Sequence, residues 1–502
     1  MEIGIDLGTT NSCVAYIDQD GNPQIIPNDE GGRTTPSVIF FEEDRVIVGN
    51  QAKEEALIHP EDTVSYIKRH MGDKDFKYAR KDGQIFSPED LSAIILKKLK
   101  KIAEDYLGQE VDAAVITVPA YFNDAQRKAT QDAANIAGLK VLKIINEPTA
   151  AALAYGVGKE TGDQTIMIYD LGGGTFDVVI MRLEEGELRV LATNGNRQLG
   201  GFDFDNALLS YVIDYLEEKY DLDVYEDPYI IEDLRERVED AKKALSTKTK
   251  TNIIINAGGV RDRLEISQDL FNSMIADDVQ RTCDMMTFTL EDAGLDWADI
   301  DKTIFVGGSS RISLVRQKVE DLVGKKPSFE LNPDEVVAIG AAIQASILAG
   351  EDRPDQNISG TKIIDVNSHS LGFATNNDQN VLMNSIMIEK NTPLPAEATN
   401  SFYLLNENQQ ALNIKICEGE DQDINYVTII SDTTIQLPES PRRERAEVQV
   451  TYSYDADGII HVDVFDVTTE TLMRAVDLER PSNLTKQEIL EKKNTISHLE
   501  ID

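Results

Sequence analysis

The stretch that decides the fold is Ile-Gly-Ile-Asp-Leu-Gly-Thr-Thr at residues 3–10, and the chain repeats it as Ile-Tyr-Asp-Leu-Gly-Gly-Gly-Thr at residues 168–175. Each copy is a short apolar strand ending in Asp, then Gly and Thr, followed by a second apolar run. Glycine lets a turn bring backbone N–H groups close to an anion, threonine adds a hydroxyl donor, and aspartate can hold a hydrated Mg²⁺. Two such turns facing each other would clamp a polyphosphate from both sides, although either turn alone fits an ordinary Gly-rich hairpin equally well.

Buried strands and clear helix starts accompany the repeated turn over the first two thirds of the chain. Ala113–Val118 and Thr303–Val306 are near-continuous apolar runs, which are typical of strands covered by helices on both faces. Ser87, Asn123 and Asn332 each stand three residues before an acid or a glutamine, so each predicts a helix N-terminus. The alternation indicates an α/β fold, and the repeated turn indicates two similar lobes.

The character of the sequence changes near residue 350. A polar, turn-rich stretch follows, helix periodicity fades, and short strands are separated by turns such as Asp455-Ala-Asp-Gly458. The strands expected here are Ser401–Leu405, Leu412–Ile416, Val427–Ile430, Glu447–Tyr454 and Ile459–Phe465. Thr485 with Glu488 predicts one last short helix. We therefore expect an α/β domain at residues 1–350, a linker at 351–366, an all-β domain at 367–480 and a C-terminal helical segment at 481–502.

Composition excludes several classes of protein. The 502 residues carry a net charge of −40, and such a surface repels nucleic acid and anionic membranes, because binding them needs clustered Lys and Arg. The three cysteines, Cys13, Cys283 and Cys417, lie far apart and match no metal or disulfide spacing. No apolar run approaches the ~20 residues of a membrane helix, and no leader of a basic and an apolar region opens the sequence. We therefore expect a cytosolic protein that binds neither nucleic acid nor membrane.

Three further features are compatible with a nucleotide site, and each also has a simpler interpretation. Val306-Gly-Gly-Ser-Ser-Arg311 would let a flat ring approach the backbone and stack on Arg311, or it is a tight strand–helix turn. Lys68 suits neutralisation of a γ-phosphate, or it is a solvated basic residue. Glu147 suits the positioning of a metal-bound water, or it is a favourable acid at a helix start. Gly156–Gly162 lacks the spacing of a phosphate loop, so we interpret it as a surface turn.

Together these residues resemble a known family. Asp6-Leu-Gly-Thr-Thr10 and Asp170-Leu-Gly-Gly-Gly-Thr-Phe-Asp177 are similar to the two phosphate motifs of the actin, hexokinase and heat-shock ATPase superfamily. Val115–Arg127, Ile145–Gly156, Leu199–Asp205 and the Gly307 turn resemble DnaK-type seventy-kilodalton heat-shock chaperones in particular. The resemblance implies a two-lobed actin-like ATPase domain, then a small all-β sandwich-like peptide-binding domain and a short C-terminal helix.

The resemblance also implies roles for individual residues. Asp6, Asp170, Glu147 and Asp177 would surround hydrated Mg²⁺ and K⁺, and Lys68, Glu147, Asp170 and Thr175 would act in catalysis. ATP or ADP would be bound by Gly8, Thr9, Thr10, Asn11, Gly172, Gly173, Gly174, Thr175, Gly201, Glu239, Lys242, Lys243, Ser246, Gly307, Gly308, Ser309, Arg311 and Asp334. Pro119 and Arg127 would relay the nucleotide state to the β-domain. An extended apolar peptide would be held by Phe373, Phe402, Leu405, Leu412 and Ile414, although plain core is the simpler interpretation of apolar residues in strands.

Several positions depart from the family pattern. The interdomain linker reads Lys362-Ile-Ile-Asp-Val-Asn-Ser368 where the family has a run of leucines, so we expect weaker docking of the two domains. Only a stub stands where the family has a helical lid, so bound peptide is expected to leave fast. Ser246–Phe271 is shorter than in the main bacterial members, which puts the usual nucleotide-exchange partner in doubt. Lys143 replaces an arginine that serves the J-domain partner, and Leu405 replaces a small residue over the peptide cleft.

The sequence therefore predicts a lidless, DnaK-type ATPase that acts as a specialised chaperone for unfolded polypeptide, with a J-domain protein as partner. ATP hydrolysis would switch the β-domain between loose and tight peptide binding. The alternative is an ATP-gated scaffold whose β-domain docks one folded partner. A sugar or small-molecule kinase of the same superfamily is a third hypothesis, but it leaves the β-domain unexplained.

Overall fold

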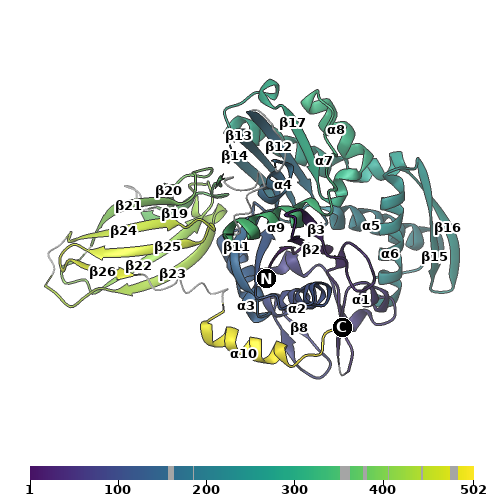
Figure 1. Ribbon diagram of the computed structural model, residues 1–502, viewed down its shortest axis with the longest axis horizontal. Helices are drawn as coiled ribbons and strands as arrows, with labels where there is room; N and C mark the ends of the chain where they lie inside the picture. The colour runs from purple at the N-terminus through teal and green to yellow at the C-terminus, as the bar shows by residue number, and fades with distance from the viewer. Residues whose placement is uncertain are drawn as a thin grey trace.

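The computed structural model describes residues 1–43, 45–156, 163–184, 186–350, 362–376, 381–404, 406–441, 445–474 and 484–502. Two lobes built on β-sheets lie next to each other, and a β-domain projects from one side (Figure 1). Within these ranges no helix is both long and apolar enough to cross a membrane. The expected surface turn at Gly156–Gly162 falls almost wholly outside them, and so does Leu405.

The two lobes repeat one strand arrangement, which confirms the duplication predicted from the two turns. The first sheet has the order β11 (Lys140–Asn146), β10 (Ala113–Val118), β1 (Glu2–Asp6), β2 (Asn11–Ile17) and β3 (Pro23–Ile25), with β4 (Thr35–Pro36) also paired to β2. The second has the order β17 (Lys302–Val306), β12 (Gln164–Leu171), β13 (Phe176–Glu184), β14 (Glu187–Asn196) and β18 (Lys362–Ile364). In both, the strand before the Gly turn runs antiparallel to the strand after it and parallel to its other neighbour. The turns therefore occupy equivalent positions in the two lobes.

Helices cover the sheets, and two of them fill the space between the lobes. α4 (Glu147–Gly156) and α9 (Val336–Leu348) pack on each other and contribute apolar residues to a core shared by the two sheets. The other large helices are α2 (Pro88–Leu107), α3 (Asp124–Ile136), α5 (Gly201–Tyr220), α6 (Pro228–Leu245), α7 (Gln268–Asp292) and α8 (Ser313–Val323). Smaller elements are α1 (Asn50–Glu55), β5 (Ile39–Phe41), β6 (Val46–Val48), β7 (Thr63–Val64), β8 (Tyr78–Ala79), β9 (Ile85–Phe86), β15 (Lys250–Ala257) and β16 (Val260–Ser267). Short 3-10 turns are η1 (Pro60–Asp62), η2 (Ile67–His70), η3 (Trp297–Asp299) and η4 (Gly308–Arg311).

Two of the three helix starts named above carry the expected cap. The Ser87 and Asn123 side chains each accept a hydrogen bond from the backbone N–H three residues on, completing capping boxes at α2 and α3. The prediction at Asn332 is wrong, because α9 begins only at Val336 with no side-chain cap. The Glu335 carboxylate accepts hydrogen bonds from Asn332 Nδ2 and from Arg33 Nε, each at 2.6 Å, so it is shared with a residue far away in the sequence.

The C-terminal third is a β-sandwich, as the strand pattern predicts. One sheet has the order β20 (Leu382–Ile388), β19 (Leu371–Asn376), β22 (Ala411–Glu418) and β23 (Thr428–Gln436), with η5 (Ile424–Tyr426) beside it. The other has the order β21 (Ala396–Tyr403), β24 (Glu447–Tyr454), β25 (Ile460–Asp466) and β26 (Thr471–Arg474). Apolar residues of both sheets face inward and form one core between them.

Both ends of the β-domain return to the ATPase-like lobes, which the sequence did not predict. Residues 362–364, expected in a linker, form β18 and extend the second lobe's sheet by pairing with β14. After the sandwich, α10 (Lys486–Ser497) packs on α2 and α3 of the first lobe (Figure 1). Ile501 bridges to Val46 at the edge of β6, and both residues belong to the first lobe's core. The altered linker is therefore docked in this structure.

Candidate nucleotide site

A cavity of about 450 Å³ lies between the lobes, where the two Gly turns meet. It is lined by most of the residues that the resemblance nominates: Asp6, Gly8, Thr9, Thr10, Asn11, Lys68, Glu147, Asp170, Gly172, Gly173, Thr175, Gly201, Glu239, Lys242, Lys243, Ser246, Gly307, Gly308, Ser309, Arg311 and Asp334. Gly174 and Asp177 lie just outside this lining. The structure thus brings together residues that are as far apart as 328 positions in the sequence (334 − 6).

The two turns interlock across the cavity. A Cβ built on Gly174 would stand 2.6 Å from Thr9 Cγ2, and one on Gly173 would overlap Thr10 Oγ1. Only glycine permits this approach, because any side chain on the second turn would collide with the threonines of the first. The turns therefore present backbone N–H groups and hydroxyls to one shared space, which suits a polyphosphate.

Lys68 forms a buried ion pair with Glu147 at the floor of the cavity. Lys68 comes from η2 and Glu147 is the first residue of α4, so the pair joins two separate elements of the first lobe. Burial together with the Glu147 charge raises the pKa of Asp6 to about 7. The same causes raise the pKa of Asp170 well above its ordinary value. The floor thus holds several carboxyl groups that repel one another when ionised, and a cation would relieve that repulsion.

Asp177 fits a cation site in a further respect. One carboxylate oxygen accepts the backbone N–H of Tyr121 at 2.9 Å, while the other is buried with no hydrogen-bond partner in the described chain. Burial, followed by the Glu147 charge, raises the pKa of Asp177 to about 7. Within the described residues no three acidic, His or Cys side chains lie close enough to ligate one ion directly. Carboxylates are the ligands that Mg²⁺ prefers, and this ion keeps several of its waters when it is bound.

The far end of the cavity is built from the second lobe. Gly307 has a φ of 76°, and a Cβ there would stand 2.7 Å from Asp170 Oδ1, so the turn after β17 needs glycine. Lys242 Nζ donates to Asp205 at 2.6 Å and to the Gly201 carbonyl at 3.1 Å, which fixes α6 against the start of α5. Arg311 pairs with Asp334 at 2.8 Å on the rim. These groups line the part of the cavity that the resemblance assigns to adenosine.

Sequence reasoning missed several lining residues, notably Tyr66, Phe202, Asp205 and Arg316. Asp205 closes the Leu199–Asp205 motif, so its position in that motif could have indicated it. Arg316 lies five residues beyond Arg311 and donates to its carbonyl at 2.9 Å. Phe202 lies in the same Leu199–Asp205 motif, so its position could have indicated it as well, whereas Tyr66 carried no signal.

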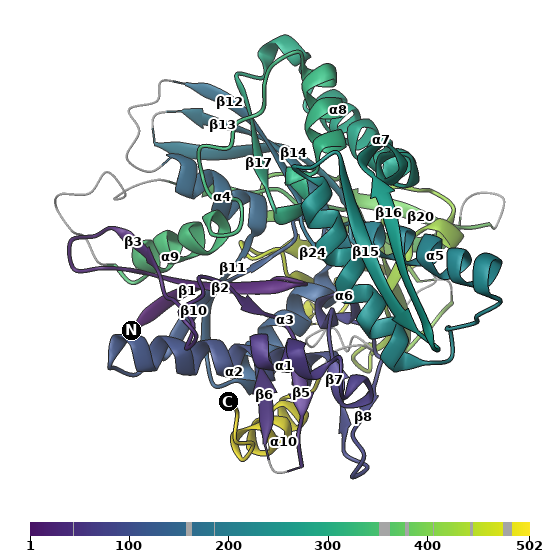
Figure 2. The ribbon, with the colours of Figure 1, turned by 90° about the vertical axis from the view of Figure 1, so that its right-hand side faces the viewer.

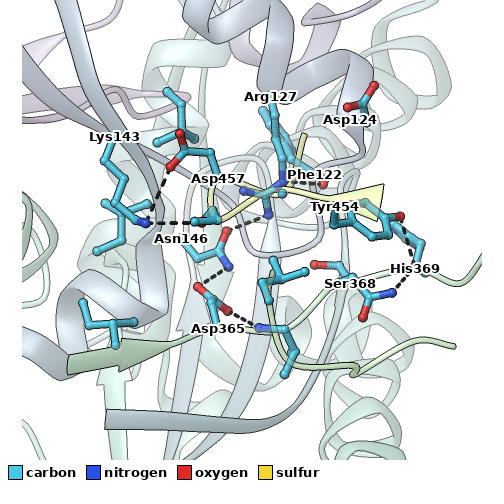
Figure 3. A pocket seen from close by; sticks show the side chains of 18 of the residues that line it. Phe122, Asp124, Arg127, Lys143, Asn146, Asp365, Ser368, His369, Tyr454 and Asp457 are labelled. Carbon is cyan, nitrogen blue, oxygen red and sulfur yellow. Dashed lines mark hydrogen bonds and ion pairs between the residues drawn. The ribbon is translucent and has the colours of Figure 1, made fainter. Parts of the chain in front are cut away.

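A second, smaller cavity marks the contact between the first lobe and the β-domain (Figure 3). Arg127 lies buried at its centre and donates to the carbonyls of Ala120 and Phe122 and to Asn146 Oδ1, the last at 2.6 Å. Asn146 donates in turn to Asp365, directly after β18, at 2.9 Å. Pro119 is buried at the end of β10 beside this group. The chain from Arg127 through Asn146 to Asp365 physically connects the lobe to the linker.

Lys143, which the resemblance assigns to a J-domain partner, contacts the β-domain in this structure. Its ammonium donates to the Ala456 carbonyl at 3.2 Å and lies 3.6 Å from Asp457 (Figure 3). Four of the five residues nominated for peptide binding lie in or against the sandwich core, and the fifth, Leu405, is outside the described residues. Phe373 and Ile414 are buried, and Phe402 and Leu412 are half-buried against the same core. The Phe373 and Phe402 rings pack edge to face with 4.6 Å between their centroids.

Comparison with known proteins agrees with this arrangement. The family model described as Hsp70 protein matches residues 2–499. The proteins named Chaperone protein DnaK from two strains of Halobacterium salinarum are each 40% identical to this chain over 508 aligned residues, which cover 100% of this chain and 78% of the relative. The resemblance stated from the motifs is thereby confirmed, and the chain belongs to the Hsp70 family.

Proposed function

We propose that this chain is an ATP-dependent molecular chaperone, in which ATP hydrolysis between the lobes changes the affinity of the β-domain for extended apolar polypeptide. The interlocked turns carry the proposal, because two Gly and Thr turns facing one cavity, with a buried Lys68–Glu147 pair at its floor, suit the phosphates of a nucleotide. The names of the two relatives favour a chaperone over the scaffold alternative.

At the phosphate end, Thr9, Thr10 and Thr175 would donate hydroxyls, and Lys68 would neutralise the terminal phosphate and orient the attacking water. Glu147 holds the Lys68 ammonium in place, which is its contribution to positioning. Asp6, Asp170 and Asp177 would hold hydrated Mg²⁺, which supplies charge neutralisation on the phosphates when it is bound. A K⁺ ion at the same carboxylates is part of the proposal. Gly307, Gly308, Arg311 and Asp334 would hold the adenosine.

The nucleotide state would reach the β-domain through Arg127, Asn146 and Asp365, since these residues connect the first lobe to the linker. The functional domains that we propose are residues 1–350 and 367–480, with a linker at 351–366 between them and a C-terminal segment at 481–502. β18 would be the segment that leaves its sheet when the β-domain undocks. A J-domain partner, an exchange factor and a cytosolic location stay predictions.

Single-turnover ATP hydrolysis with and without a seven-residue apolar peptide tests the proposal. Acceleration by peptide is expected if the domains communicate. Lys68→Ala should lower turnover by ~10²–10³, the usual scale for one charge contact to a transition state, and should leave ATP binding measurable. Unchanged turnover in Lys68→Ala would remove that residue from the mechanism.

The scaffold alternative stays a second hypothesis. Phe373 and Ile414 of the nominated peptide site are buried in the sandwich core, while the β-domain exposes other apolar side chains such as Tyr403 and Tyr426. Hydrolysis that ignores peptide, together with a folded partner that apolar peptide does not displace, would favour the scaffold.

A further inference from the structure

The ring of Phe202 is contacted by two guanidinium groups, one from each lobe. Arg69, from η2 of the first lobe, places its Cζ 4.7 Å from the ring centroid. Arg235, from α6 of the second lobe, places its Cζ 5.2 Å from the same centroid. Cations over an aromatic face are attracted by the ring's quadrupole, and the attraction strengthens when water is excluded. Phe202 belongs to the first turn of α5 and lines the cavity between the lobes.

Tyr66 adds a second aromatic ring to this stack. It approaches Phe202 with 4.5 Å between centroids and an interplanar angle of 54°. The Tyr66 backbone is left-handed, with a φ of 59° and a ψ of 24°, which is rare for a bulky residue and needs support from its surroundings. Two residues later the same segment supplies Lys68. Tyr66 directly precedes η2, the 3-10 turn that carries Lys68. The left-handed backbone at Tyr66 therefore affects both the contact with Phe202 and the position of Lys68.

The stack is fixed to the phosphate turns by short hydrogen bonds. The Phe202 N–H donates to the Gly173 carbonyl at 2.8 Å, and Arg69 makes a bidentate ion pair with Asp203, both bonds at 3.1 Å. Asp203 in turn accepts the Gly200 N–H at 2.8 Å. Any opening of the lobes must therefore separate Tyr66 and Arg69 on one side from Phe202 and Asp203 on the other.

We propose that Tyr66, Arg69, Phe202 and Arg235 form an aromatic clasp that holds the two lobes closed and limits the release of nucleotide. The clasp adds a control of nucleotide release to the proposed function. Only the measurement of nucleotide release rests on that function, and the contact between the lobes does not. Other contacts also cross the cleft. One is the ion pair at 2.6 Å between Lys53 of α1 and Glu239 of α6, two helices that are labelled in Figure 2. The Lys53 side chain of that ion pair is 36% exposed and the Arg69 side chain at the Phe202 ring is 13% exposed, so salt should weaken the ion pair more than the stack.

The lobe separation tests the clasp without nucleotide. Spin labels at Gln51→Cys and Asp240→Cys, both exposed and on opposite lips of the cleft, report the distance by pulsed electron resonance. The native cysteines are buried, which confines labelling to the new sites. At 0.5 M salt the unaltered chain should give one short distance, and Phe202→Ala or Tyr66→Asn should add a longer one. Asparagine is chosen because it tolerates the left-handed backbone.

Nucleotide release gives the second measurement, with a fluorescent ADP displaced by excess ATP. Phe202→Ala and Tyr66→Asn should each release it roughly tenfold faster, because an aromatic pair with a cation over its face contributes about that factor. Phe202→Tyr keeps the ring and should behave as the unaltered chain. Phe288→Ala, which removes a ring that is 55% exposed on α7, is the matched control. The double variant should fall short of the product of the singles, because both remove the same contact.

Unchanged distances in both variants would overturn the clasp whether or not the chain binds nucleotide. Loss of nucleotide binding in the unaltered chain, with the distances shifting as expected, would support the clasp and refute the proposed function instead. Release rates equal to that of Phe288→Ala, with nucleotide bound, would refute the role of the clasp in release.

Discussion

Acid should loosen the docking of the β-domain through His369. This residue follows the linker and is buried against the first lobe, with its ring 4.2 Å from that of Tyr121 and its Nε2–H donating to the Tyr121 carbonyl at 3.3 Å. Burial lowers the pKa of His369 from 6.5 to about 3, and the positive charges of Arg197, Lys390 and Arg127 act in the same direction. The docked state therefore holds a neutral imidazole.

The sign and size follow from proton linkage. The undocked imidazole in water keeps a pKa near 6.5, so below that pH the undocked state binds more protons than the docked state. Docking is at full strength above pH 6.5 and weakens as the pH falls toward 3. At pH 5.5 an exposed histidine is about 90% protonated and a docked one is almost wholly neutral. The docking equilibrium should thus shift about tenfold toward the undocked state between pH 7.5 and 5.5, or about 1.4 kcal/mol.

Energy transfer between dyes at Glu110→Cys and Glu407→Cys, both exposed, measures the docked fraction across this pH range. His369→Gln keeps a donor for Tyr121 but cannot titrate, so it isolates the contribution of the histidine. The comparison is needed because burial raises the pKa of Asp365 in the same interface, which favours docking as the pH falls. Identical pH profiles for the unaltered chain and His369→Gln would refute the reasoning.

Other parts of the structure give equally direct expectations. Gly174→Ala should weaken ATP binding at least tenfold while the melting temperature changes little, because the new Cβ would stand 2.6 Å from Thr9 Cγ2 across the cleft. Calorimetric titration measures the ATP affinity of the variant. Ile501→Asp buries a charge in the first lobe's core and should cost about 3 kcal/mol of unfolding free energy by denaturant titration, whereas Ile58→Asp at a 60% exposed site should cost little. Arg127→Met leaves the Asn146 oxygen without its donor, and the dye pair should report undocking at neutral pH.

Most of the first lobe and the phosphate end of the site could be predicted, because their signals are local. A strand, an aspartate and a glycine turn stand together in the sequence. The phosphate turns at Asp6–Thr10 and Asp170–Thr175 could therefore be predicted without tertiary information. The failure at Asn332 has the opposite cause. Its capping pattern was intact, but Glu335 pairs with Arg33, which is 302 residues away. Local patterns cannot anticipate a competing partner from a distant part of the chain.

The pairing of the linker with the second lobe was not predicted, for a related reason. The loss of leucines in Lys362–Ser368 predicted weak docking, yet β18 adds to the second lobe through backbone hydrogen bonds, which do not depend on the lost side chains. Similarly, the capping box at Thr485 predicted a helix but not its docking on the first lobe, because a helix's own residues determine that it forms and not which surface receives it.

By itself the sequence determined the α/β duplication, the two phosphate turns, the β-sandwich and the family, since each rests on spacing between neighbouring residues. Only the tertiary structure decided which groups meet across the cleft and between the domains. Tyr66, Arg69, Phe202 and Arg235 become one stack, and His369 becomes a buried base, through contacts between segments far apart in the chain. The energies of these contacts arise from desolvation and close approach. Both occur only when segments that are distant in the sequence pack together.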